Sequence, residues 1–248
     1  MSKVMIITGA SRGIGAATAR LAAQQGYAVC INYRVNARAA EALKDELSTI
    51  GTSVIAVQAD VGVEAEVIRL FQTVDHELGR VNVLINNAGM LEPQMPVTSM
   101  SAERITRVFN TNVVGSFLCA REAIVRMSTK HGGAGGSIVN VSSMAARLGS
   151  PNEYVDYAAA KGAIDTFTIG LAKEVAAEGI RVNAVRPGLI HTEMHASGGE
   201  AGRIERLKDS VPLKRGGRPE EVAHAILWLA SDEASYTTGT FIDVSGGR

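Results

Sequence analysis

Short apolar segments alternate with segments of helical pattern along the chain, and this alternation limits the possible folds more than any other feature. The apolar segments have the length of strands, and their continuous apolar character is typical of strands buried in a parallel sheet. Helical segments between them imply right-handed crossovers. The chain is therefore predicted to be an α/β protein with a doubly wound, seven-stranded parallel sheet flanked by helices on both faces. The predicted strands are Val4–Thr8, Ala28–Tyr33, Val54–Val57, Val81–Ile85, Ser137–Val141, Arg181–Val185 and Thr240–Val244.

Periodic apolar positions, with glycine or proline near their ends, identify the helices. No linker or repeat interrupts the 248 residues, so a single domain over residues 1–248 is expected. Residues 189–217 are rich in glycine, histidine and charge, and we predict an irregular substrate lid there. The predicted helices cover residues 16–23, Ala37–Ile50, Glu64–Leu78, a long segment from the N-cap Ser101 to Met127, Tyr154–Glu178 and Pro219–Ala230.

The charge and cysteine content argue against several classes of protein. The formal net charge is zero, so no basic surplus favours binding to nucleic acid or to an anionic membrane. No apolar stretch approaches membrane-spanning length, and the run after Met1-Ser2-Lys3 is too short for a signal peptide. Cys30 and Cys119 lie in apolar runs and are predicted to be buried thiols in a reducing compartment. A soluble cytoplasmic protein is expected.

A glycine-rich turn joins the first predicted strand to the first predicted helix. It reads Thr8-Gly9-Ala10-Ser11-Arg12-Gly13-Ile14-Gly15. Glycine permits a tight turn and lets a ligand approach the backbone closely. The N–H groups at the start of the following helix suit a phosphate, as they do in dinucleotide-binding proteins. The turn therefore predicts a nucleotide site.

The same turn also matches Gly-x-Ser-x-Gly, the nucleophile elbow of α/β-hydrolases. In that alternative Ser11 is a nucleophile that acts with a downstream Asp and His. However, the oxyanion donors of that fold come from a loop before the elbow, and only eight residues precede Gly9. Gly15 also has no purpose in an elbow, whereas it suits a dinucleotide pyrophosphate. The hydrolase is the weaker alternative.

Tyr157 and Lys161 lie four residues apart in a predicted helix, so their side chains share one face. A free phenol has a pKa of about 10. A nearby ammonium group lowers that pKa toward neutral, where a general acid–base is most effective. Alone, the pattern also fits a half-buried Tyr beside a solvated Lys, so its meaning depends on the other motifs.

Together these features resemble the short-chain dehydrogenase/reductase family over nearly the whole chain. The resemblance implies a Rossmann-type fold and an NAD(P)-dependent oxidoreductase that interconverts a carbonyl and an alcohol. The chain is similar to the branch with 3-oxoacyl-carrier-protein reductases and sugar dehydrogenases, which the sequence does not separate. The motifs are Thr8-Gly9-x-x-x-Gly13-x-Gly15, Asn86-Asn87-Ala88-Gly89, Asn112, Ser142-Ser143, Tyr157-x-x-x-Lys161 and Pro187-Gly188.

The resemblance implies a role for each catalytic residue. Tyr157 would donate a proton to the carbonyl oxygen as hydride arrives, or accept it in the reverse direction. Lys161 would bind the nicotinamide ribose and, with the positive nicotinamide, lower the pKa of Tyr157. Asn112 would position Lys161 through a water, unless its side chain bonds back to its own helix. A nucleotide-binding regulator without catalysis is a further alternative, against which the presence of these residues together with Ser143 argues.

The serine that holds the substrate oxygen departs from the family pattern. In the family it commonly precedes the Tyr by thirteen residues, a position that Met144 occupies here. Ser143 precedes Tyr157 by fourteen, so the loop between them is predicted to hold one extra residue. Strand alternation places Ser142 and Ser143 on opposite faces. The Ser-Ser pattern favours Ser143 as the catalytic serine and Ser142 as its structural partner.

The resemblance also implies cofactor-binding residues, among which two arginines bear on the choice of cofactor. Enzymes that prefer NAD place an acid at the end of the second strand, but here that strand ends Asn32-Tyr33-Arg34. Arg12 and Arg34 suit a 2′-phosphate, so NADP(H) is favoured over NAD(H). The implied residues are Gly9, Ser11, Arg12, Gly13, Ile14, Gly15, Arg34, Asp60, Val61, Asn86, Asn87, Ala88, Gly89, Tyr157, Lys161, Pro187, Gly188, Ile190 and Thr192.

The remaining expectations concern assembly, metals and the substrate. The resemblance implies a homotetramer that packs the helices of Asn112 and Tyr157 between subunits, and the small face Ala158-Ala159-Ala160 is compatible with this packing. His191 and His195 have no Cys or clustered carboxylate at ligand spacing, so no metal is expected. The substrate is expected to be a small carbonyl compound or alcohol. Its predicted mouth residues are Met90, Leu91, Met95, Met144 and Tyr154.

Overall fold

Seven parallel strands form one sheet in the computed structural model, which describes residues 2–248. Their order is β3-β2-β1-β4-β5-β6-β7. The strand order reverses between β1 and β4, and ligands of such sheets bind outside the carboxyl ends of the strands at this point. The predicted fold class is confirmed, and every predicted strand is present. The strands are β1 (Val4–Ile7), β2 (Ala28–Tyr33), β3 (Val54–Gln58), β4 (Val81–Asn86), β5 (Gly136–Val141), β6 (Ile180–Pro187) and β7 (Phe241–Val244).

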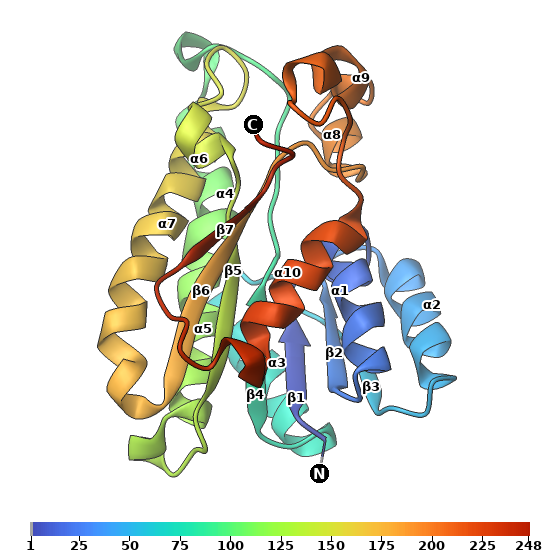
Figure 1. The fold of residues 1–248 in the computed structure, drawn as a ribbon, viewed down its shortest axis with the longest axis vertical. Helices are drawn as coiled ribbons and strands as arrows, with labels where there is room; N and C mark the ends of the chain where they lie inside the picture. Colours follow the sequence, from blue (N-terminus) through green and yellow to red (C-terminus); the bar gives the residue numbers. More distant parts are fainter. Residues whose placement is uncertain (1) are drawn as a thin grey trace.

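Helices cover both faces of the sheet, because successive residues of a strand point to opposite sides. One face packs against α1 (Gly13–Gln24), α2 (Ala37–Ser48) and α10 (Pro219–Ala230) (Figure 1). The other face packs against α3 (Glu64–Glu77), α5 (Gly115–Met127) and α7 (Val155–Val175). In β1, Met5 and Ile7 belong to the first apolar core, and Val4 and Ile6 belong to the second.

The carboxyl ends of the parallel strands meet at one edge of the sheet, the upper edge in Figure 1. Three short helices lie around this edge: α6 (Ala145–Leu148), α8 (Met194–Ser197) and α9 (Arg203–Leu207). The chain's C-terminal end lies between α6 on one side and α8 and α9 on the other. Side chains from distant parts of the sequence therefore face one another here.

The long helix predicted from Ser101 to Met127 is interrupted in the structure. Ser101 caps α4 (Ala102–Phe109) as predicted, and its hydroxyl accepts a hydrogen bond from the N–H of Arg104. A π-helical turn over Asn110–Val114 then separates α4 from α5. Such turns are rare and occur frequently at functional sites. This turn contains the buried Asn112.

Residues 189–217 are more regular than predicted, because they include α8 and α9. The ends of the segment are joined, since Gly217 donates its N–H to the carbonyl of Leu189 at 2.8 Å. Leu189, Ile204 and Val211 form a small apolar cluster of their own. Residues 189–217 therefore form a folded segment whose two ends lie next to each other at the edge of the sheet.

Candidate active site

A cavity of about 410 Å³ opens between the carboxyl edge of the sheet and residues 189–217. The end of β5 and the first turns of α7 form one wall, which includes Val141 and Tyr157. Met194 and Leu207 belong to the opposite wall. The walls also include Leu91, Met144 and Tyr154 as predicted, whereas Met90 and Met95 do not line the cavity.

Tyr157 lines this cavity, and the hydroxyl of Ser143 lies beside its phenol. Burial raises the pKa of Tyr157 to about 12, and the hydrogen bond with Ser143 opposes this rise. The ammonium nitrogen of Lys161 is 5.6 Å from the centre of the Tyr157 ring. The phenol pKa is therefore raised rather than lowered by the protein's own groups, because burial outweighs the hydrogen bond with Ser143.

Lys161 is buried at the base of the cavity, where its Nζ donates to the carbonyl of Val141 at 2.8 Å. Burial lowers the pKa of Lys161 to about 8, and the carboxylate of Asp165 opposes this fall. At neutral pH the ammonium form therefore still predominates. The side chain is a positive charge at a fixed point below Tyr157.

Asn112 reaches the same point from the π-helical turn. Its amide donates to the carbonyls of Val108 at 2.8 Å and Met90 at 3.1 Å, and its Oδ1 accepts from the N–H of Met90 at 3.2 Å. A Cβ placed on Gly89 would lie 2.9 Å from Asn112 Oδ1 and 3.7 Å from Lys161 Nζ. Asn112 thus bonds back to its own helix, and its Oδ1 and Lys161 Nζ both lie close to Gly89.

The two serines after β5 have different surroundings. Ser142 is buried, and its hydroxyl lies 2.6 Å from Asp165 Oδ1 and 3.3 Å from the carbonyl of Lys161. Ser143 is partly exposed and lies beside the Tyr157 phenol. Both serines belong to the cavity lining, and only Ser143 lies beside the phenol, so its role as the substrate-binding serine stays a prediction.

The glycine turn after β1 has the features of a phosphate site. α1 begins at Gly13 without a side-chain cap, because the N-cap residue Arg12 makes no capping hydrogen bond. The first N–H groups of the helix are therefore available to an anion. Gly9 has a φ of +62°, and a Cβ there would lie 2.9 Å from Ala88 Cα. Glycine is needed here for close packing against the loop after β4, and the turn fits a dinucleotide pyrophosphate.

The predicted cofactor-selecting residues lie at the ends of β2 and β3. Arg34 is about half exposed, and its guanidinium lies 3.6 Å from the carboxylate of Asp60. Asp60 Oδ1 also accepts a hydrogen bond from the N–H of Gly62 at 2.9 Å. Arg12 is exposed at the glycine turn. The sequence did not predict this ion pair, which brings an acid close to the arginine proposed for a 2′-phosphate.

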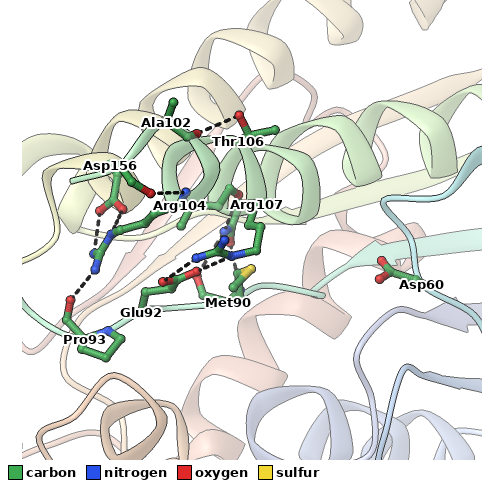
Figure 2. A network of polar contacts seen from close by, with 12 residues as sticks. Asp60, Met90, Glu92, Pro93, Ala102, Arg104, Thr106, Arg107 and Asp156 are labelled. Carbon is green, nitrogen blue, oxygen red and sulfur yellow. Dashed lines mark hydrogen bonds and ion pairs between the residues drawn. The ribbon is translucent and has the colours of Figure 1, made fainter.

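A buried ion pair supports the start of α7. Arg104 on α4 donates through Nε to Asp156 Oδ2 at 2.7 Å, and both side chains are almost inaccessible to solvent. The same guanidinium donates to the carbonyl of Pro93 at 2.6 Å (Figure 2). Asp156 Oδ1 accepts from the N–H of Tyr157 at 2.9 Å. The pair thus links α4, the loop after β4 and the backbone of Tyr157.

Ion pairs join residues 189–217 to the loop before α7. Arg203 pairs with Glu153 at 2.5 Å and with Glu200 at 3.3 Å. Arg206 pairs with the same two carboxylates, at 2.9 Å and 2.5 Å. The guanidinium of Arg203 also lies 4.9 Å from the centre of the Tyr154 ring. Sequence reasoning missed these residues, because their spacing along the chain gives no sign that they meet.

The structure gathers the predicted site residues at one edge of the sheet. The side chain of Asn86 points away from the cavity and donates to Asn140 Oδ1 in the interior. Gly9, Ser11, Arg12, Gly13, Gly15, Arg34, Asp60, Val61, Ala88 and Asn112 lie outside the cavity wall. Those that line the cavity are Ile14, Asn87, Gly89, Ser143, Tyr157, Lys161, Pro187, Gly188, Ile190 and Thr192.

Two further features bear on the class of site. Within residues 2–248, no three or more His, Cys, Asp or Glu side chains are arranged to hold a metal ion. None of the described helices combines the length and the apolar character needed to cross a membrane. Cys30 and Cys119 are buried free thiols, as predicted.

Comparisons with known proteins agree with this geometry. A family model described as enoyl-(acyl carrier protein) reductase matches residues 9–248. The chain is 57% identical over 245 residues to the uncharacterized oxidoreductase YgfF of Escherichia coli, with 99% of each chain covered. It is 40% identical over 247 residues to a 3-oxoacyl-[acyl-carrier-protein] reductase of Synechocystis sp., covering 99% of this chain and 96% of that protein. The crystal structure of a short-chain type dehydrogenase/reductase from Mycobacterium marinum matches with a TM-score of 0.93 and 34% identity, covering 99% of this chain and 94% of that chain.

Proposed function

Since the chain belongs to the short-chain dehydrogenase/reductase family of nicotinamide-dependent oxidoreductases, we propose that it interconverts a carbonyl and an alcohol with NADP(H), using Tyr157 as the general acid–base. One observation carries this proposal. Tyr157, Ser143 and Lys161 lie together at a cavity on the carboxyl edge of the sheet. This is the edge at which doubly wound folds bind nucleotides.

The nicotinamide, when bound, supplies or accepts the hydride. Tyr157 would deliver its proton to the carbonyl oxygen, while Ser143 would hold the same oxygen through a hydrogen bond. Because burial raises the pKa of Tyr157 to about 12, its protonated form predominates at neutral pH, which suits reduction. Oxidation needs the phenolate, and the positive charge of Lys161 would stabilise it. Asn112 would hold Lys161 in place from the other side of Gly89.

The glycine turn and the loops after β4 and β6 would hold the cofactor. The uncapped N–H groups of α1 would bind the pyrophosphate. Residues 87–89 would follow the cofactor toward Tyr157, with Asp60 and Val61 near the adenine. Pro187, Gly188, Ile190 and Thr192 would lie against the nicotinamide end.

The proposal is tested by measuring the oxidation of NADPH in the presence of each member of a panel of carbonyl compounds. The panel consists of ketones, quinones, 3-oxoacyl thioesters and sugars, and NADH is run alongside. We expect at least one class to be reduced. Binding of NADPH without turnover of any class would favour a regulator without catalysis. Ester hydrolysis that is lost in Ser11→Ala would favour the hydrolase, whereas the proposal expects Ser11→Ala to leave reduction largely unchanged.

The preference for NADP(H) rests on Arg12 and Arg34 and on the lack of an acid at the end of β2. Arg34→Gln should lower the kcat/KM for NADPH relative to NADH by about tenfold, the size of one charge-assisted hydrogen bond. The variant also frees Asp60 to repel a 2′-phosphate. Arg80 is an exposed arginine after α3, so Arg80→Gln removes the same charge elsewhere and is the control. Equal rates of the wild type with NADH and NADPH would contradict the preference.

A homotetramer is supported by apolar side chains that the isolated chain leaves exposed. Val114 in the π-helical turn of Asn112, Phe117 and Val125 on α5, and Ile169 on α7 are each more than 40% exposed. In contrast, two alanines of the Ala158-Ala159-Ala160 face are already buried within the chain. The exposed apolar side chains therefore support assembly better than the small face does. A monomer in sedimentation velocity would contradict this assembly.

A further inference from the structure

Arg248 lies in the wall of the cavity, far from the catalytic residues in the sequence. Its backbone is anchored by the turn that precedes it. The carbonyl of Gly246 accepts a hydrogen bond from the N–H of Leu213 at 3.1 Å, and Ser245 Oγ donates to the main-chain carboxyl oxygen of Arg248 at 3.2 Å. The chain end lies between α6 and α9 (Figure 1). These contacts hold the main chain of Arg248 beside the cavity.

The carboxylates near Arg248 already have partners. Glu153 and Glu200 each pair with both Arg203 and Arg206. Two carboxylates thus face two guanidinium groups, and this group of four side chains is neutral as a whole. Neither of these two side-chain carboxylates is left without an arginine partner.

The guanidinium of Arg248 makes neither a hydrogen bond nor an ion pair with the side chains of residues 2–248, so its donors remain available. Burial lowers the pKa of Arg248, the positive charges of Arg203 and Arg206 lower it further, and Glu153 opposes them. An arginine nevertheless stays protonated in proteins. His195 in the same wall adds no charge at neutral pH, because burial and Arg203 lower its pKa. A guanidinium whose donors are unpaired within residues 2–248 therefore lies at the cavity wall.

We propose that Arg248 binds an anionic group of the substrate, so that the enzyme acts on carbonyl compounds that bear a carboxylate or a phosphate. A guanidinium offers a planar fork of donors that matches the oxygens of either group. Partial burial strengthens such a contact relative to water. Met144, Leu148 and Leu189 line the cavity and suit the carbon chain of the substrate. This inference rests on the proposed function and specifies its substrate class.

Matched substrate pairs test the inference. The pairs are 4-oxopentanoate with its methyl ester, and dihydroxyacetone phosphate with dihydroxyacetone. Wild-type enzyme should favour the anionic member of at least one pair, and the two pairs distinguish carboxylate from phosphate. Arg248→Gln should raise the KM for that member by about tenfold or more, the size of a lost charge-assisted hydrogen bond. Its kcat, and the kcat/KM of the neutral member, should stay nearly constant.

Two further variants separate a direct contact from a general effect of charge. Arg248→Lys keeps the charge without the planar fork and should retain part of the affinity. Arg80→Gln removes one positive charge outside the cavity and should change neither member of a pair. Equal losses for the anionic and the neutral member in Arg248→Gln, or no change in either, would overturn the inference.

Calorimetric titration of 4-oxopentanoate, dihydroxyacetone phosphate and their neutral partners, with NADPH present, distinguishes failure of this inference from failure of the proposed function. Tighter binding of an anion by the wild type than by Arg248→Gln supports the anion site even where no hydride transfer is seen. Reduction of neutral ketones with no preference for either anion, in binding or in turnover, overturns the anion site and leaves the reductase standing.

Discussion

The two walls of the cavity are stabilised in different ways. The sheet-side wall consists of Ser142, Ser143, Tyr157 and Lys161, and buried hydrogen bonds to main-chain and side-chain groups hold it in place. The lid-side wall consists of residues 189–217, which ion pairs join to Glu153. The first wall is held by buried hydrogen bonds, whereas the second depends on ion pairs in which Arg203 is buried and Arg206 is exposed to solvent. Chemistry is therefore expected to depend on the sheet-side wall and substrate affinity on the lid-side wall.

The two ion-pair systems show the difference most directly. The side chains of Arg104 and Asp156 are 3% and 2% exposed, whereas those of Arg206 and Glu200 are 46% and 21% exposed. Removing one partner of a buried pair leaves an uncompensated charge in the interior. An exposed pair is screened by water and salt, and contributes little. Similar arginine–carboxylate pairs should thus respond very differently to substitution.

The largest expected effect concerns Tyr157. Tyr157→Phe removes the proton donor and should lower kcat by about 10²–10⁴-fold, the usual contribution of general acid–base catalysis. NADPH binding, measured by calorimetry, should remain nearly intact, because the phenyl ring keeps the shape of the wall. Tyr236→Phe is the control, since Tyr236 is fully exposed. Near-normal turnover by Tyr157→Phe would exclude this residue as the acid–base.

The second effect concerns the ion pair behind the sheet-side wall. Asp156→Asn leaves Arg104 buried without a counter-charge and should lower the free energy of unfolding by about 3–5 kcal/mol. Urea denaturation followed by circular dichroism measures this change. The double variant Arg104→Met/Asp156→Leu should recover much of the loss, because it removes both charges. A single variant as stable as the wild type would show that solvent reaches the pair.

The sequence was sufficient to predict the sheet-side wall, because its parts are local or periodic. The apolar runs determine the strands, and the parallel order then places Gly9, Gly89 and Ser143 at one edge. Tyr157 and Lys161 face the same way because four residues make about one helical turn. The choice of Ser143 over Ser142 rests on strand alternation and on the family's Ser-Ser pattern, and it stays a prediction.

The lid-side wall could not be predicted in this way, because its contacts join residues far apart in the chain. Neither the pairing of Arg203 with Glu153 nor the approach of Arg248 has a local signal. The π-helical turn at Asn112 was also missed, since the apolar pattern of α4 and α5 reads as one helix. The Tyr-x-x-x-Lys spacing predicts that the pKa of the phenol falls. Burial raises this pKa instead, and the spacing does not reveal how deeply the phenol is buried.

The third effect concerns Lys161 and is a dependence of stability on pH. The pKa of Lys161 is about 8 in the folded protein, against about 10.4 for an unfolded lysine. Between these values the unfolded state binds more protons, so the free energy of unfolding should rise with pH, by up to about 1.4 kcal/mol per pH unit. Lys161→Met lacks this contribution, and it is the control.

The difference in unfolding free energy between wild type and Lys161→Met should therefore increase from pH 8 to pH 10. Burial raises the pKa of Tyr157 to about 12, which lowers stability above about pH 10, where an unfolded phenol loses its proton first. Tyr157 is present in both proteins, so this contribution cancels. A difference that does not change with pH would mean that Lys161 is more solvated than the structure shows.

The smallest expected effect tests the lid-side wall. Arg206→Gln breaks exposed ion pairs with Glu153 and Glu200, and Arg203 continues to pair with both carboxylates. The free energy of unfolding should fall by less than about 1 kcal/mol. The pKa of Glu200, which the hydrogen bond from Arg206 lowers to about 2, should rise toward its usual value. Urea denaturation at low and at high salt measures the first change, and carboxyl NMR titration measures the second.

Salt makes this last experiment decisive for the comparison of the two walls. Screening by about 1 M salt shortens the range of exposed charges to about 3 Å, so the effect of Arg206→Gln should largely disappear. The effect of Asp156→Asn should persist, because ions do not enter the interior around Arg104. If Arg206→Gln instead costs as much as Asp156→Asn, and the loss resists salt, the lid-side pairs are buried in the working protein. Residues 189–217 would then be a fixed wall of the cavity, and turnover as well as affinity would depend on them.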